Sequence, residues 1–192
     1  MGEIKTALEI ALERSQTIKS DKSSIEQFEM KQQGKKLANA FLAGAADIAE
    51  EIKKTPKEGR ESLKQGVFDV LIAQIALPAS DDDRKRIEKT GEGLNLVIEK
   101  KEFSALFKEL MQIIGQYLQE ASHYEQMIRQ QYAPKLRQKE EELSRRLGRE
   151  VRIDPLQDPE FVAFYSQHIK ALRGNYEAVI DQAKEETRKM FG

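Results

Sequence analysis

The sequence predicts an all-α protein, an elongated multi-helix bundle with three long helices of ~30 residues each around a buried apolar helix. Two observations predict this fold class. Charged residues make up 34% of the 192-residue chain and aromatic residues only 7%, so much polar surface surrounds little core. Apolar residues also recur at helical spacings along most of the chain, and 5 prolines and 11 glycines are too few for a turn-rich protein. We expect residues 1–192 to form a single helical domain.

The first predicted helix runs from about Glu3 to Ile18. It carries a narrow seam of residues at alternating spacings of four and three: Ile4, Leu8, Ala11, Ser15 and Ile18. A seam of this width suits contact with one partner helix, so we interpret residues 1–20 as an N-terminal interaction helix. The Ser-Asp-Lys-Ser-Ser segment at 20–24 is expected to end this helix, because such residues cap the start of the next one.

Residues 25–54 are predicted to form one long helix, or two joined near Gly34, ending at Thr55-Pro56. A row of small residues would let a neighbouring backbone approach this segment closely: Gly34, Ala38, Ala45 and Ala49. The segment from Val67 to Leu77 is apolar on nearly every side. It is therefore predicted to be the buried central helix, stopped by Pro78.

Ser80 is predicted to cap the next helix, whose first turn is acidic and whose apolar face holds Ile87, Gly91, Leu94, Val97 and Ile98.

The helix from Phe103 to about Gln131 has three adjacent apolar columns with seven-residue spacing. Together they form a face wide enough to contact two neighbouring helices. Pro134 is expected to kink or restart the chain. Residues 134–158 are predicted to be a charged helix, ended at Gly148, plus a connector. Asp158 and Pro159 then begin a final helix that reaches Phe191.

The strongest metal-binding pattern is the Glu-x-x-His formed by Glu120 and His123. This spacing places a carboxylate and an imidazole on one helix face, as in bundles that bind two metal ions. Such sites need a second pair, but the chain has only 2 histidines, and Tyr165 stands where a glutamate is needed before His168. A pair at the polar edge of the helix is the favoured interpretation. An internal metal or small-ligand site that uses Glu120, His123 and Tyr117 or Tyr124 is the alternative.

Three other features have structural explanations. His168 lies on the apolar stripe of the last helix and is expected to be a buried, hydrogen-bonded imidazole. Asp69 is an isolated acid in the apolar segment and needs a partner there, because an unpaired buried carboxylate is costly. The acidic run of residues 81–83 is explained by the helix start rather than by a cation site, since no calcium-loop pattern is present.

The charge pattern gives no nucleic-acid signal. The net charge is −1, from 32 basic and 33 acidic residues, which does not favour a dedicated binder of nucleic acid or anionic membranes. The stretch from Lys135 to Arg152 has seven basic and four acidic residues of alternating sign. It is interpreted as a solvated helix, with contact to phosphate or an acidic protein as the weaker reading.

No enzyme signature is present. The chain has no cysteine, which excludes disulfides and thiol chemistry, and no phosphate loop, dinucleotide fingerprint or serine-nucleophile motif occurs. The longest apolar run, residues 67–77, is well short of the roughly 20 residues that span a bilayer. We therefore assign no catalytic, cofactor or metal-binding residue and no cofactor. We expect a non-enzymatic cytoplasmic protein that binds protein partners, forms a coiled-coil-like homo-oligomer, and binds neither membrane nor nucleic acid.

Overall fold

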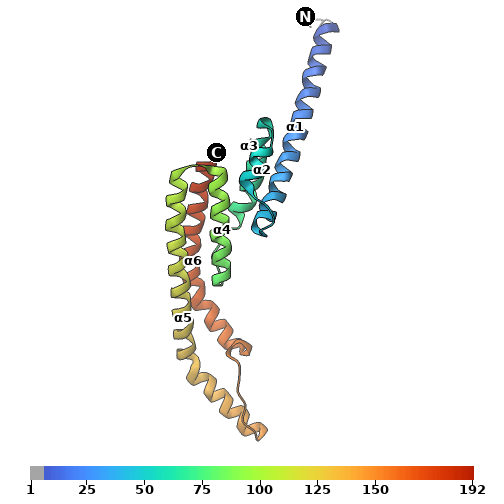
Figure 1. The fold of residues 1–192 in the computed structure, drawn as a ribbon. Coiled ribbons are helices and arrows are strands. Elements are labelled where there is room, and N and C mark those ends of the chain that lie inside the picture. Colours follow the sequence, from blue (N-terminus) through green and yellow to red (C-terminus); the bar gives the residue numbers. More distant parts are fainter. Residues whose placement is uncertain (1–6) are drawn as a thin grey trace, which may run out of the picture. The chain divides into compact units, whose positions relative to one another are not determined.

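The computed structural model describes the backbone from Ala7 to Gly192 and the side chains from Ser23 onwards. Within this range the chain forms helices and no strand, so the all-α multi-helix fold is confirmed (Figure 1). The elements are α1 (Ala7–Leu42), α2 (Ile48–Lys54), α3 (Lys57–Ala73), α4 (Asp81–Ile98), α5 (Lys101–Leu147), the 3₁₀ turn η1 (Pro155–Gln157) and α6 (Pro159–Phe191). No described helix has an apolar stretch of the length that crossing a bilayer demands.

The chain divides into two compact units. The first holds the residues up to Ile75, with 86–100 and Phe191, and the second holds 76–85, 101–190 and Gly192. The single-domain assignment for residues 1–192 stays a prediction. The three long helices are α1, α5 and α6, with 36, 47 and 33 residues. α6 has the predicted bounds, whereas α5 extends beyond the predicted end near Gln131.

The break predicted at residues 20–24 is wrong, because α1 continues through this segment. Serine, aspartate and lysine each cost only tenths of a kcal/mol in a helix, roughly 0.5 for the worst of them, and the segment has no proline or glycine to force an end. Ile4 lies outside the described residues. The side chains of the seam from Leu8 to Ile18 also lie outside them, so that prediction is untested.

Of the two alternatives for residues 25–54, the structure has two helices, and the break between them lies at Gly44 rather than near Gly34. Gly44 has a φ of +78°, and its N–H donates to the carbonyl of Phe41 while the N–H of Ala45 donates to that of Ala40. This pair of bonds is the Schellman ending of a helix, which needs a left-handed residue and so favours glycine. Asp47 then caps α2 by accepting a hydrogen bond from the N–H of Glu50 at 3.0 Å.

Gly34 instead marks the place where α1 and α3 touch. A Cβ on Gly34 would lie 2.1 Å from the carbonyl oxygen of Leu63, and one on Gly66 would lie 2.0 Å from that of Lys31. Ala38 is also fully buried, so the small-residue row predicted a real close approach. The row ends there, because Ala45 follows the end of α1 and is exposed.

The apolar segment is shorter and less enclosed than predicted. α3 ends at Ala73 rather than Leu77, because the ring of Pro78 disfavours helical geometry in the residues before it. Val67 and Leu71 are fully buried, but Ala73 and Ala76 are exposed. The prediction of burial on every side is therefore wrong for the end of the segment.

The start of α4 agrees with the prediction. The Oγ atom of Ser80 accepts a hydrogen bond from the N–H of Asp83, whose carboxylate accepts from the N–H of Ala79. These reciprocal bonds resemble a capping box and satisfy amides that the first helical turn leaves without partners. The predicted apolar face of α4 is buried, with Ile87, Gly91, Leu94, Val97 and Ile98.

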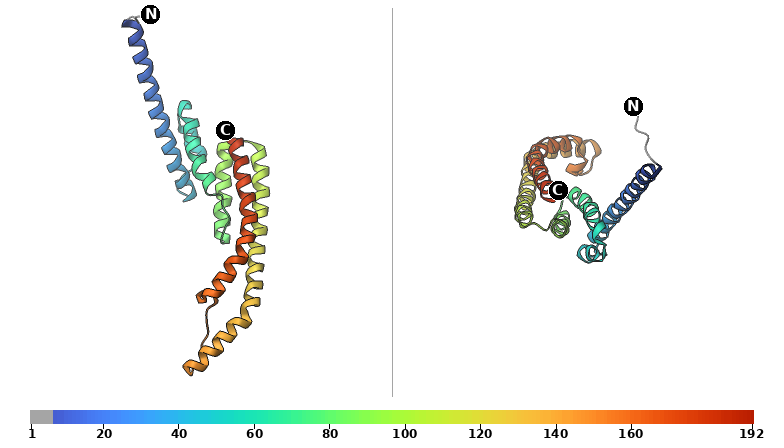
Figure 2. Two further views of the ribbon diagram at one scale, coloured as in Figure 1. Left: turned by 180° about the vertical axis from the view of Figure 1, so that it is seen from behind. Right: turned by 90° about the horizontal axis from the view of Figure 1, so that it is seen from above.

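In the second unit, α5 and α6 run side by side (Figure 2). α5 contains Pro134 within the helix and changes direction in its yellow-to-orange stretch, so the predicted kink is present without a restart (Figure 1). Ile128 and Tyr132 pack with Phe161 in one buried cluster that joins the two helices. Gly148, with a φ of +65°, follows the last residue of α5, and Asp158 caps α6 as predicted.

Candidate functional site: a neutral groove on α5

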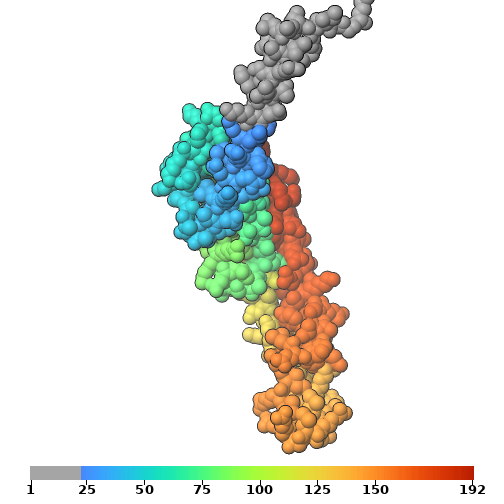
Figure 3. Space-filling model, turned by 90° about the vertical axis from the view of Figure 1, so that its right-hand side faces the viewer, coloured from blue at the N-terminus to red at the C-terminus, as the bar shows by residue number. Residues whose placement is uncertain are grey.

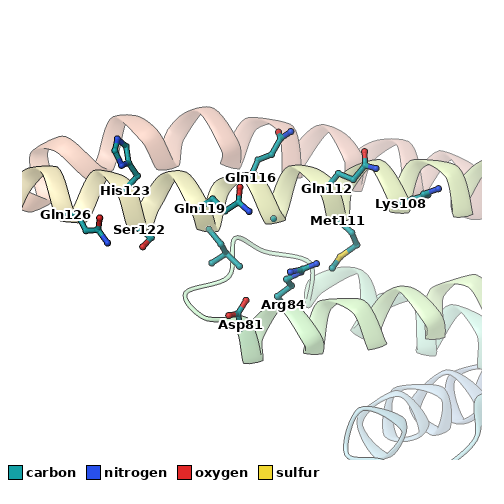
Figure 4. Close-up of a pocket in the computed structure, with 12 residues that line it drawn as sticks. Asp81, Arg84, Lys108, Met111, Gln112, Gln116, Gln119, Ser122, His123 and Gln126 are labelled. Atoms are coloured by element: carbon teal, nitrogen blue, oxygen red, sulfur yellow. The ribbon is translucent and has the colours of Figure 1, made fainter.

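A surface groove of about 880 Å³ runs along α5 in the second unit (Figure 4). Most of its lining lies on one face of α5, at spacings of three and four residues. The start of α4 contributes Asp81 and Arg84. The α5 residues are Lys108, Met111, Gln112, Gly115, Gln116, Leu118, Gln119, Ser122, His123 and Gln126. We call this hollow the α5 groove.

The α5 groove is uncharged over most of its length. The nine lining residues from Met111 to Gln126 include no Asp, Glu, Lys or Arg, and four of them are glutamines. The solvent face of a helix in a protein with 34% charged residues normally carries charges. All four glutamines are exposed, and within the described chain none of their side chains bonds another residue. The groove therefore presents primary amides, each a donor and an acceptor, without a fixed partner.

The groove lacks the arrangement that nucleophilic catalysis requires. Ser122 and His123 both line it, but adjacent residues on a helix do not face each other, so the imidazole is not placed to activate the hydroxyl. The remaining polar groups from Met111 to Gln126 are amides, which do not titrate near neutral pH. This part of the groove can bind by hydrogen bonding and packing.

Glu120 and His123 are both exposed on α5, as expected at the polar edge of the helix, and they have different neighbours. His123 lines the groove, whereas the Glu120 carboxylate accepts a hydrogen bond from Tyr176 of α6. Burial of the Tyr176 hydroxyl and this hydrogen bond together raise its pKa. Tyr117 is buried with its ring centre 5.2 Å from that of Tyr176, and Tyr124 is exposed. Among the described residues no group of three His, Asp or Glu side chains could hold a metal ion.

His168 is half-buried rather than buried. Its Nδ1 atom lies 2.8 Å from the carbonyl oxygen of Phe164 one turn earlier in α6, and its ring packs on the Phe164 ring. A carbonyl oxygen only accepts, so Nδ1 carries the proton in this hydrogen bond. Packing and a local hydrogen bond explain His168 without a ligand.

Asp69 has a charged partner, as its position in the apolar segment predicted. Its carboxylate lies 2.8 Å from the Nζ atom of Lys31 in α1 and accepts from the amide of Gln65 at 2.8 Å. Burial raises the pKa of Asp69, but the hydrogen bonds from Lys31 and Gln65 outweigh it and the pKa lies below its usual value. One third of the side chain is exposed, so this ion pair contributes modestly to stability.

The most highly connected polar cluster joins α5 to the start of α6, and sequence reasoning missed it. The Nζ atom of Lys139 lies 2.9 and 2.8 Å from the two carboxylate oxygens of Asp158, and the Tyr132 hydroxyl donates to Asp158 at 3.0 Å. Glu160 bonds Lys139 at 3.0 Å and Lys135 at 2.7 Å. We call these five residues the α5–α6 clamp. Figure 3 shows the connector and the start of α6 in orange, at the lower end of the second unit.

The pKa shifts in the clamp keep its groups in their ordinary protonation states, as expected of a structural contact. The hydrogen bond to Asp158 is the main cause that raises the pKa of Lys139, so this lysine stays protonated and is no nucleophile at neutral pH. Burial and the bond to Asp158 raise the pKa of Tyr132, which keeps its proton. The hydrogen bond from Lys139 lowers the pKa of Asp158 against the opposing effect of burial. The clamp therefore holds two helices rather than a reacting group.

The stretch from Lys135 to Arg152 is more structured than a solvated charged helix. Lys135 and Lys139 bind acids of α6, Glu140 accepts from the backbone N–H of Ile153, and Arg145 lies 3.9 Å from Glu141. Lys135 and Lys139 thus pair with acids outside the stretch, which neutralises most of its local excess of positive charge. A nucleic-acid role gains no support from this stretch.

Comparison with known proteins identifies a family without a known role. A family model described as "Family of unknown function (DUF6657)" matches residues 49–189, which is more than half of the chain. The matched region begins in α2 and ends in α6, and so contains the whole α5 groove. No curated protein matches the chain, and no solved structure does.

Proposed function

The chain belongs to a family of unknown function, DUF6657, and we propose that it is a non-enzymatic interaction protein that binds other proteins and copies of itself. In this proposal α1 is the self-association helix, and the chain works in the cytoplasm as a homo-oligomeric scaffold. The single observation that carries the proposal is the exposure of two large apolar side chains on α1.

Phe28 and Ile25 lie one turn apart on α1 with 62% and 59% of their surface exposed. A lone exposed apolar residue is ordinary in a soluble protein, but two on one helix face form a patch. A hollow of about 420 Å³ between α1 and the start of α3 is lined by other residues, among them Met30, Pro56 and Glu58, so Ile25 and Phe28 lie on the face of α1 that points away from it. The exposure of these two side chains on the uncovered face supports a contact with another polypeptide.

The continuity of α1 supports a seam that reaches this patch. Because the helix is unbroken through residues 20–24, Ala11, Ile18 and Ile25 occupy equivalent positions seven residues apart on one helix. A seven-residue apolar repeat is the pattern by which two helices pair along their length. Ile25 is exposed, so the other helices of the first unit do not cover this part of the seam.

The test is the native mass of the double variant Ile25→Asp/Phe28→Asp, measured by mass spectrometry under non-denaturing conditions. We expect wild-type protein at a multiple of 22.0 kDa and the variant at a smaller multiple, with unchanged helical circular dichroism. The matched control is Val162→Asp/Val179→Asp, two exposed apolar residues of α6, which should keep the wild-type mass.

Changing Ile4, Leu8 and Leu12 to aspartate tests the predicted N-terminal seam and should have the same effect as the α1 double variant. A wild-type monomer would refute self-association. A wild-type oligomer that both α1 variants retain would refute the role of α1.

A further inference from the structure

We infer that the α5 groove is a second self-association surface, in which two copies pair antiparallel about a two-fold axis through Gln119. In this arrangement His123 of each copy lies over Gly115 of the other. The inference goes beyond the proposed function, because it rests on α5 and is independent of the exposed residues of α1.

The chemistry of the groove favours a second copy as its occupant. A charged surface repels an identical surface across a two-fold axis, whereas an uncharged one does not. A primary amide can donate to an identical amide and accept from it, so a row of glutamines is complementary to itself. The four groove glutamines are exposed and make no bond to the rest of the described chain, so their hydrogen-bonding capacity is available.

The spacing of the groove residues is symmetric about Gln119. Gln112, Gly115 and Gln116 precede Gln119 by seven, four and three residues, and Gln126, His123 and Ser122 follow it by the same intervals. Antiparallel helices related by a two-fold axis at Gln119 therefore set Gln112 of one copy against Gln126 of the other. At 1.5 Å per residue this register covers about 21 Å of helix.

No contact within the described residues requires a glycine at position 115. Gly115 lies inside α5, where glycine is less stable than alanine, and a Cβ placed on it would meet no atom of the described chain within 4 Å. A glycine on a half-exposed helix face is explained if a side chain of another molecule approaches the backbone there. The antiparallel register supplies that side chain, because the position opposite Gly115 is His123.

The direction of pairing follows from the same two residues. A parallel pair would set His123 against His123 and Gly115 against Gly115, with two rings at one level and a gap at the other. The antiparallel pair matches a large side chain with a small one twice, as close packing requires. It also places the helix dipoles in the favourable antiparallel orientation.

The first experiment measures mass in the Ile25→Asp/Phe28→Asp background, so that loss of the α1 contact is separated from loss of the α5 contact. We expect this protein to remain a dimer of twice 22.0 kDa. Adding Gln119→Glu or Gln119→Lys should weaken the dimer at least tenfold, because like charges meet on the axis. An equal mixture of the two charged variants should recover the dimer as a heterodimer.

Three outcomes would overturn the inference: a monomer before Gln119 is changed, dimers that both charged variants retain, or a mixture that stays monomeric. Failure of the α1 proposal would look different, since the α1 variants would then keep the mass of the wild-type protein.

The second experiment tests register and direction by cross-linking, which is clean because the chain has no cysteine of its own. Under mild oxidation, Gln119→Cys alone should give a disulfide-linked dimer. Gly115→Cys mixed with His123→Cys should also link, while neither should link with itself. The control is Gly174→Cys, an exposed glycine of α6 that likewise has open space around it. Self-linking of Gly115→Cys without linking in the mixture would establish a parallel pair and overturn the inference.

Discussion

The Nζ atom of Lys139 lies within 2.9 Å of both carboxylate oxygens of Asp158, so one lysine of α5 holds the residue that caps α6. Asp158 also accepts from the backbone N–H of Glu160, so its carboxylate serves as cap and as ion-pair partner at once. The Asp158 side chain is only 4% exposed. Removal of this carboxylate would disturb the helix start and the contact between the helices together.

Asp158→Ala should lower the free energy of unfolding by about 2 kcal/mol, because it removes a helix cap and leaves the buried Tyr132 hydroxyl without its main acceptor. Urea denaturation followed by circular dichroism measures the change. Asp154→Ala is the matched control. Asp154 caps η1 in the same way, through the N–H of Leu156, but it is exposed. An equal loss in both variants would show that the clamp adds nothing to capping.

The clamp should also make stability depend on acid pH. The pKa of Asp158 lies below its usual value because Lys139 bonds the charged form, so the unfolded chain, with a pKa of about 3.9, takes up protons first as pH falls. The contribution of Asp158 is therefore fully present above about pH 5 and is lost as pH falls through the folded-state pKa. The stability difference between wild type and Asp158→Asn should be constant from about pH 7 to 5 and shrink below about pH 4. A difference unchanged down to about pH 3 would contradict this assignment.

Gly34→Ala should destabilise the first unit by about 1–3 kcal/mol, because the new methyl group meets the backbone of α3 rather than a movable side chain. Gly66→Ala should behave alike, since its Cβ would meet the backbone of α1. Gly174→Ala is the control. It fills open space on α6 and should raise stability by up to about 1 kcal/mol. Chemical denaturation of the three variants gives the comparison, and a stabilised Gly34→Ala would refute the backbone contact.

Gly44→Ala should lower stability by about 1–2 kcal/mol for a different reason. No backbone crowds Gly44, but its φ of +78° is unfavourable for a residue with a side chain. Gly44→Asn should recover part of the loss, because asparagine tolerates left-handed geometry better than alanine. Thermal unfolding of both variants tests this, and equal melting temperatures for the two would argue against conformational strain.

Local signals in the sequence predicted much of the fold. The helix starts at Ser80 and Asp158 and the helix end at Gly148 were predicted because capping depends on residues a few positions apart. The break at residues 20–24 was mispredicted from residues that only weakly disfavour a helix. Gly44 was overlooked although it carries the usual signal for a helix end.

Contacts between segments that are distant in the sequence could not be predicted from local patterns. Gly34 was recognised as a point of close approach, but nothing local identifies Gly66 as its counterpart. Lys139 and Asp158 are 19 residues apart across a connector, so their pairing depends on how α5 and α6 fold back on each other. The symmetric glutamine spacing of the α5 groove is visible in the sequence. Its exposure follows only from knowing which face of α5 packs against the rest of the second unit.

The position of the clamp has a consequence for the hairpin beyond it. Residues 140–157 form the end of α5, the connector and η1, and they lie between the two partners Lys139 and Asp158. The clamp holds α5 and α6 together at the point where this hairpin begins. We therefore expect that residues 140–157 can be lengthened or shortened without shifting α5 against α6. The turn at Gly148, where an added Cβ would meet no atom of the described chain within 4 Å, is therefore a suitable point to attach a label or a fused domain.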